Sequence, residues 1–139
     1  MKRDLIKNAS EQQPDITINF LTNNTTLIGL IDERTVGHIL NNLLSNAIKY
    51  SNAGNTVKFT LYSHNKRAIF EIEDQGIGIP SEELSSLFNS FHRCKNVSNI
   101  SGTGLGLSIV KKCVDMLQGE ISVKSEIGVG TKFTVAIPL

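Results

Sequence analysis

Three polar side chains, Asn42, Asn46 and Lys49, have types and a spacing suited to binding a ligand. At 100° per residue, a helix places Asn46 about 40° and Lys49 about 20° from Asn42. Apolar residues occupy the opposite side, as expected of a helix packed on a core: Val36, Ile39, Leu40, Leu43, Leu44, Ala47 and Ile48. Asn is a poor helix former, so this stripe indicates a surface facing a ligand, a metal ion or another segment. On this stretch alone, a helix that tolerates a few Asn is the simpler interpretation.

A glycine-rich segment, Gly102-Thr103-Gly104-Leu105-Gly106-Leu107, precedes a second predicted helix. Glycines let a backbone approach a ligand closely, and the free N–H groups at a helix start favour anions. Such turns also occur for geometry alone. The spacing excludes a Walker A loop, which needs Gly-Lys-Ser/Thr, and a GxGxxG fingerprint, because position 107 is Leu.

A carboxylate and two glycines, in Asp74-Gln75-Gly76-Ile77-Gly78, follow another predicted strand. A carboxylate at a strand end is able to accept a hydrogen bond from an amino group such as the adenine N6. The alternative is a turn aspartate that bonds its own backbone.

Hydrophobic periodicity predicts the elements that position these groups. Alternation predicts a strand at 16–20 paired with one at 26–31, an antiparallel hairpin of 57–64 and 68–74, and strands at 121–125 and 133–137. Helical spacing predicts helices from about 32 to 51, from 81 through 91, and from about 105 to 117.

Composition indicates one globular domain. The chain has 139 residues, 40% of them hydrophobic and 19% charged, with a net charge of +1. Without a basic block, nucleic-acid binding has no compositional support. Cys94 and Cys113 form no CxxC motif, so free thiols are expected rather than structural zinc. We expect neither a signal peptide nor a membrane contact in this segment, and a monomer for the isolated domain.

The order of the motifs resembles the catalytic, ATP-binding domain of sensor histidine kinases. Residues 42–50 (NLLSNAIKY) look like the N box, 74–79 (DQGIGI) like the G1 box, 87–93 (LFNSFHR) like the F box and 102–110 (GTGLGLSIV) like the G2 box. Residues 128–133 (GVGTKF) look like the closing hairpin, and the resemblance covers about 15–139.

The resemblance implies an α+β fold of the Bergerat type, shared with gyrase, the heat-shock chaperone and mismatch-repair ATPases. This fold is a two-layer sandwich: a mixed, mostly antiparallel sheet of about five strands backed by three main helices. Residues 15–139 would form this catalytic domain. Residues 1–14 would be the stub of a linker from a missing upstream dimerisation and phosphoacceptor domain.

The resemblance also implies ATP and Mg²⁺ as cofactors. At the phosphate end, Asn46 would ligate Mg²⁺, Asn42 would assist at the metal or phosphates, and Lys49 would contact phosphate oxygens. Tyr50 would pack near the sugar or phosphates. The G2 residues Gly102, Thr103, Gly104, Leu105, Gly106 and Leu107 would hold the phosphates, and Arg93 would contact them from a lid at 93–101.

At the adenine end, the resemblance implies that Asp74 accepts from the N6 amino group, with Thr131 nearby. Gly76 and Gly78 would let the backbone approach the base, and Ile79 would complete this end.

Position 42 bears on the reaction. ATP-hydrolysing relatives carry a Glu general base there, whereas Asn42 accepts no proton at neutral pH. The resemblance therefore implies slow hydrolysis and transfer of the γ-phosphoryl group to a protein histidine, with Asn42, Asn46 and Lys49 acting by positioning and charge stabilisation.

The acceptor histidine is expected on a separate helical domain, since His38, His64 and His92 all lack the family's phosphoacceptor context. The expected partners are that domain and a response-regulator receiver domain, in the cytoplasm, with membrane anchoring of the full protein left open. Two alternatives remain: a serine kinase of the anti-sigma type with the same fold, and a non-catalytic nucleotide-sensing module.

Overall fold

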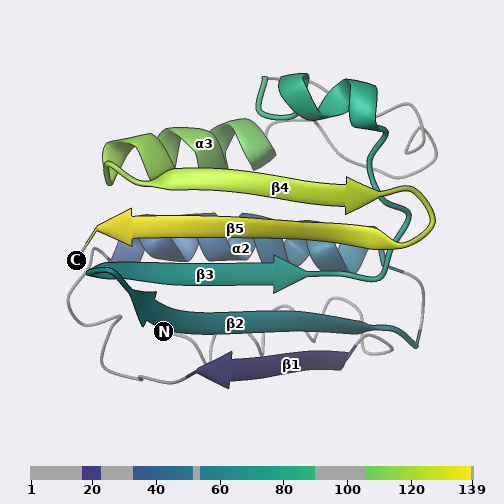
Figure 1. The fold of residues 1–139 in the computed structure, drawn as a ribbon, viewed down its shortest axis with the longest axis horizontal. Coiled ribbons are helices and arrows are strands. Elements are labelled where there is room, and N and C mark those ends of the chain that lie inside the picture. Colours follow the sequence, from purple (N-terminus) through teal and green to yellow (C-terminus); the bar gives the residue numbers. More distant parts are fainter. Residues whose placement is uncertain (1–16, 23–32, 52–53, 90–105, 139) are drawn as a thin grey trace.

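A five-stranded sheet organises the described part of the chain. The computed structural model describes residues 17–22, 33–51, 54–89 and 106–138 (Figure 1). The strands are β1 (Thr17–Thr22), β2 (Thr56–His64), β3 (Arg67–Glu73), β4 (Glu120–Glu126) and β5 (Gly130–Pro138), in the spatial order β1-β2-β3-β5-β4. The helices are α2 (Glu33–Lys49), α3 (Gly106–Met116) and the 3₁₀ helix η2 (Ser81–Ser86).

The sheet is mixed and mostly antiparallel, as predicted. β2 and β3 form the predicted hairpin, whose turn residues Asn65 and Lys66 have φ values of 51° and 61°, the pair of positive values that suits a two-residue hairpin turn. β3 also pairs antiparallel with β5, and β4 with β5. β1 pairs in parallel with β2, and its predicted partner at 26–31 lies outside the described residues.

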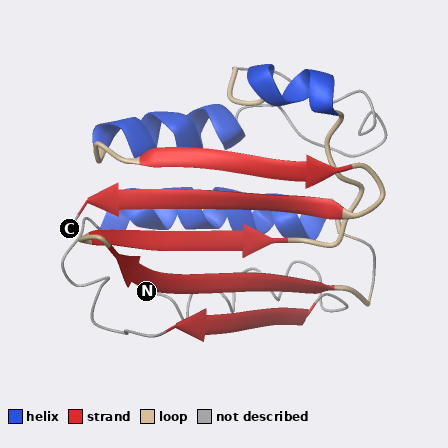
Figure 2. Cartoon of the chain, viewed as in Figure 1, coloured by secondary structure: helices blue, strands red, loops and turns tan. Residues whose placement is uncertain are grey.

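The hydrophobic core lies between one face of the sheet and α2 with α3, and α2 crosses behind β3 and β5 (Figures 1 and 2). Alternate residues of the central strands point into this core, including Phe59, Phe70 and Val135. The apolar side of α2 packs on them, and its seven predicted core residues are all buried. The hydrophobic periods of two residues along the strands and 3.6 residues along the helix therefore predicted correctly which faces pack together in the core.

A helix begins at Ser81, as predicted, but it is a short 3₁₀ helix that ends at Ser86 rather than continuing to residue 91. The chain forms the 3₁₀ helix η2 there, with the Glu83 N–H bonded to the Pro80 carbonyl at 2.9 Å, three residues back. Pro80 gives the segment no side-chain cap, and Phe91 lies outside the described residues. Leu87 is nevertheless buried, and Phe88 packs edge-on against Phe133 with ring centroids 6.4 Å apart. The described residues thus contain a helix for each of the three predicted ones, two α-helices and one 3₁₀ helix.

Candidate nucleotide site

The Asp74 carboxylate is the most deeply placed acid of the candidate site. It follows the end of β3 and is 8% exposed. Its Oδ1 accepts the backbone N–H groups of Gly76 at 2.9 Å and Thr131 at 3.2 Å. Within the described part of the chain, no donor reaches Oδ2. One oxygen is therefore fixed by the fold, and the other remains able to accept a hydrogen bond from a ligand.

Burial changes the acidity of this group. The loss of solvent raises the pKa of Asp74 from an ordinary 3.8 to about 6, although the amides of Gly76 and Thr131 act to lower the pKa. The neighbouring Glu73 carboxylate adds a smaller upward contribution to the pKa. A buried carboxylate with a raised pKa beside a cavity is a typical property of a functional site.

The loop after Asp74 is held between the end of α2 and the β4–β5 turn. The Ile77 N–H bonds the Tyr50 carbonyl at 3.2 Å, and the Gly128 N–H bonds the Ile77 carbonyl at 3.0 Å. A Cβ built at Gly76 would overlap the Tyr50 carbonyl oxygen, and one at Gly78 would overlap the Glu126 carbonyl oxygen. Both glycines are thus required by contacts within the fold. Their predicted role in approaching a base stays a prediction.

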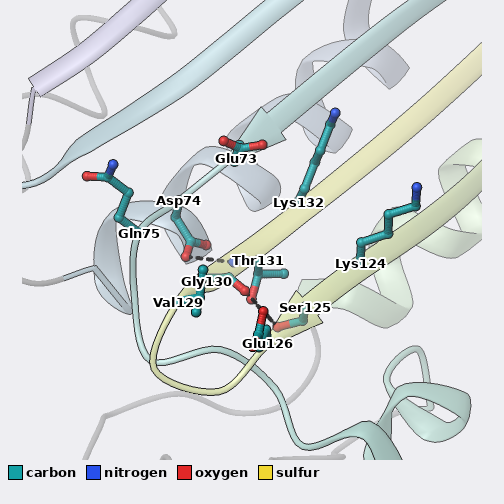
Figure 3. A pocket seen from close by; sticks show the side chains of 10 residues that line it. All are labelled: Glu73, Asp74, Gln75, Lys124, Ser125, Glu126, Val129, Gly130, Thr131 and Lys132. Carbon is teal, nitrogen blue, oxygen red and sulfur yellow. Dashed lines mark hydrogen bonds between the residues drawn. The ribbon is translucent and has the colours of Figure 1, made fainter.

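A cavity of about 490 Å³ opens beside Asp74. It is lined by the strand ends and the β4–β5 turn, and Figure 3 shows Asp74 bonded to the Thr131 backbone while the Thr131 hydroxyl meets Ser125. The lining residues are Glu73, Asp74, Gln75, Lys124, Ser125, Glu126, Val129, Gly130, Thr131 and Lys132. Thr131, predicted to lie near Asp74, does so and is 6% exposed.

Sequence reasoning missed Ser125. Its Oγ accepts the Ile79 N–H at 2.7 Å, lies 2.8 Å from Thr131 Oγ1 and donates to the Gly130 carbonyl at 3.0 Å. One sequence signal could have identified it: Ser125 lies on the same face of β4 as Ile121 and Val123, which pack on the core, so its hydroxyl is expected to point inward. Ser125 also accounts for the placement of the predicted site residue Ile79.

The stripe on α2 faces the first turn of α3. Asn42 donates its Nδ2 to the His38 carbonyl at 2.8 Å, and because a carbonyl only accepts, this bond fixes the orientation of the amide. A Cβ built at Gly106 would lie 3.3 Å from Asn42 Oδ1 and 4.0 Å from Asn46 Nδ2. The Asn42 oxygen and the Asn46 amide therefore meet the residue that starts α3, the helix predicted to bind phosphates.

Of the remaining predicted site residues, some are described by the structure and others lie outside the described ranges. Lys49 is exposed at the end of α2, with its Nζ 5.7 Å from the centroid of the half-buried Tyr50 ring. Leu107 is half-buried against the core. Five predicted residues lie outside the described residues: Arg93, Gly102, Thr103, Gly104 and Leu105. Neither Asn42 nor Asn46 lines the cavity beside Asp74.

Two searches of the described residues bear on a metal and on a membrane. No group of three or more His, Cys, Asp or Glu side chains gathers there in a way that could hold a metal ion. In the same ranges, no helix has both the length and the apolar character needed to cross a membrane.

The fold and the site define a member of one ATPase family. Residues 31–139 match the family described as histidine kinase-, DNA gyrase B- and HSP90-like ATPase, so the chain belongs to this family. Curated proteins similar to it include histidine kinases. The chain is 41% identical over 142 residues to hybrid signal transduction histidine kinase B of Dictyostelium discoideum, covering 98% of the chain and 7% of that protein.

Further relatives agree with this assignment. Circadian input-output histidine kinase CikA of Synechococcus elongatus is 37% identical, with 88% of the chain and 17% of that protein covered. Sensor histidine kinase RcsC of Escherichia coli is 41% identical, with 78% of the chain and 12% of that protein covered. The chain thus spans less than a fifth of the length of these relatives.

Solved structures agree on the fold. The mycobacterial sensor histidine kinase MprB superposes with a TM-score of 0.84 at 27% identity, over 99% of this chain and 95% of that one. The catalytic domain of histidine kinase ThkA gives a TM-score of 0.78 at 27% identity, over 98% of this chain and 91% of that one. The predicted two-layer α+β fold of this family is confirmed.

Proposed function

We propose that this domain binds ATP with Mg²⁺ and provides the γ-phosphoryl group for a histidine on a separate helical domain. The observation that carries the proposal is the buried Asp74 carboxylate, whose Oδ1 is fixed by two backbone amides while Oδ2 is open to a ligand. A base with an exocyclic amino group, such as adenine, supplies the donor that Oδ2 requires. An open depression of about 490 Å³ lies beside it at the strand ends.

The phosphates belong at the other end of the site in this proposal. The contact between the α2 stripe and Gly106 supports it, because the free N–H groups of the first turn of α3 favour an anion. Lys49, exposed at the end of α2, adds a positive charge on the predicted phosphate side. The predicted contacts from Arg93, Gly102, Thr103, Gly104 and Leu105 belong to this end.

The donors on α2 suit Mg²⁺. Amide oxygens are hard ligands for a hard cation, and Mg²⁺ is usually bound by few protein groups together with water and substrate phosphates. Asn46 would hold the ion through its side-chain oxygen, and Asn42, whose Oδ1 faces the start of α3 at Gly106, would assist. When bound, the ion neutralises charge on the phosphates. Asn42 itself accepts no proton, so the site lacks a general base at this position, which favours transfer to a protein acceptor over hydrolysis.

The proposal includes the predicted division of the full protein. Residues 15–139 form the catalytic domain and residues 1–14 the end of a linker to a dimerisation and phosphoacceptor domain. The phosphoryl group would pass from that histidine to an aspartate of a response-regulator receiver domain. Since ATP is the substrate, the domain would work in the cytoplasm, whether or not the full protein is anchored in a membrane.

Phosphotransfer in trans tests this proposal. The domain is mixed with a histidine-bearing helical domain of a related kinase and with ATP labelled at the γ-phosphate, and label on the helical domain is measured. We expect labelling that is lost in the acceptor-histidine variant and is unstable in acid, as phosphohistidine is. Acid-stable label on serine would instead support the anti-sigma-type kinase. Tight ATP binding with no labelling of any acceptor would support a nucleotide-sensing module.

A further inference from the structure

Ser125 connects three separate parts of the adenine end. The residue lies near the end of β4, and its Oγ meets the loop after Asp74 at the Ile79 N–H, 2.7 Å away. It also meets the start of β5 at the Gly130 carbonyl, 3.0 Å away, and at Thr131 Oγ1, 2.8 Å away. Figure 3 shows Ser125 beside Thr131, and both residues line the cavity.

The number of protons determines the direction of each hydrogen bond. The Ser125 hydroxyl has one proton and two lone pairs, and the Ile79 N–H occupies one lone pair. The Gly130 carbonyl only accepts, so at 3.0 Å it requires the Ser125 proton; otherwise two oxygen lone pairs would face each other. With that proton used, Thr131 must donate its own hydroxyl proton to Ser125.

This arrangement fixes the polarity of Thr131. Once its proton points at Ser125, the Thr131 hydroxyl has only lone pairs to offer the cavity. The neighbouring Asp74 carboxylate also offers only lone pairs through Oδ2, and its Oδ1 is tied to the Thr131 amide at 3.2 Å. Both side chains at this end of the cavity are therefore acceptors.

From this geometry we infer that Ser125 is a positioning residue that sets base selectivity, by holding the Thr131 hydroxyl as an acceptor beside Asp74. Such an end of the cavity fits a base with a 6-amino group and disfavours a base with a 6-oxo group, whose oxygen would face two acceptors. Without the Ser125 hydroxyl, Thr131 is free to rotate and to donate to a 6-oxo group. The inference rests on the proposed nucleotide binding and assigns a role to a residue outside the predicted motifs.

Nucleotide selectivity tests the inference. Dissociation constants for ATP and GTP, measured by calorimetry in the presence of Mg²⁺, give the ATP/GTP preference of each variant. We expect Ser125→Ala to reduce this preference about tenfold, the effect of about one hydrogen bond. Ser125→Thr, which keeps the hydroxyl, should restore it. Ser122→Ala is the matched control, since Ser122 lies on the same strand, is exposed and points to the helix-free face.

A second variant separates positioning from a loss of stability. Thr131→Val removes the acceptor and nearly keeps the side-chain shape, so it should reduce the preference as much as Ser125→Ala. The double variant should reduce it no further, because both changes remove one arrangement. An unchanged ATP/GTP preference in folded Ser125→Ala, or additive effects in the double variant, would overturn the inference while leaving the proposed function intact. A wild-type domain that binds no nucleotide would instead refute the proposed function.

Discussion

Replacing Asp74 by Asn should make the nucleotide-free domain more stable. Burial raises the pKa of Asp74 from 3.8 to about 6, so the folded state binds the proton more tightly than the unfolded state does. The difference of 6 − 3.8 = 2.2 pH units corresponds to about 3 kcal/mol of folding free energy lost on ionisation. Asn has the same shape and keeps an oxygen for the amides of Gly76 and Thr131, but carries no charge.

The sign of this effect gives it a characteristic pH dependence. For a carboxyl group whose folded-state pKa is raised, the penalty is absent below pH 3.8, grows between pH 3.8 and 6, and is complete above pH 6. Asp74→Asn should therefore raise the free energy of unfolding by about 3 kcal/mol at pH 7.5 and by about 0.6 kcal/mol at pH 4. These values are upper estimates, because the Asn amide N–H groups also need partners.

Urea denaturation of the nucleotide-free domain at several pH values measures this effect. The control is Glu73→Gln, an adjacent exposed carboxyl, whose effect should stay within about 0.5 kcal/mol. If Asp74→Asn lowered the stability at pH 7.5, or raised it equally at pH 4 and pH 7.5, the account of a destabilising buried carboxylate would be wrong. Confirmation would mean that the fold carries an energetic cost at Asp74, as is typical of a functional site.

Three further predictions follow from the same contacts. Gly76→Ala should destabilise the domain by about 2–4 kcal/mol, because a Cβ there would overlap the Tyr50 carbonyl oxygen. Gly37→Ala on α2 is the control: its Cβ would lie in open space, so the change should stabilise the domain by about 0.5–1 kcal/mol. Equal effects of the two changes in urea denaturation would contradict this prediction. ATP affinity should fall about tenfold per pH unit below pH 6, as Asp74 gains a proton, and calorimetry should find no such fall in Asp74→Asn. Asn42→Glu should raise ATP hydrolysis by supplying a general base beside Gly106; unchanged phosphate release with retained ATP binding would argue against the role given to position 42.

The sequence predicted most of the fold because periodicity and burial agree. The alternation of Val57, Phe59 and Leu61 with polar residues identifies a strand with one buried face, and the apolar stripe of α2 identifies the helix that covers it. At Ser81 the sequence predicted where a helix begins but not its type: Leu84, Leu87 and Phe88 have helical spacing, and spacing alone does not separate an α-helix from a short 3₁₀ helix.

The candidate site was predictable only where its residues lie in motifs. Asp74 and the stripe from Asn42 to Lys49 have distinctive types and spacing, and the structure brings Asp74 to Thr131 and the stripe to Gly106. Ser125 was not predictable, since a single serine in a strand is common and its contacts join segments far apart in the sequence. The reason for Gly76, a backbone approach to Tyr50, likewise depends on tertiary structure.

Calorimetric titration of the wild-type domain with a non-hydrolysable ATP analogue, with and without Mg²⁺, tests the central claim most directly. The account predicts binding of one nucleotide per chain that strengthens with Mg²⁺ and is sharply weakened by Asp74→Asn, in a variant shown to be folded. The absence of binding to the folded wild-type domain, or an unchanged affinity in Asp74→Asn, would contradict it.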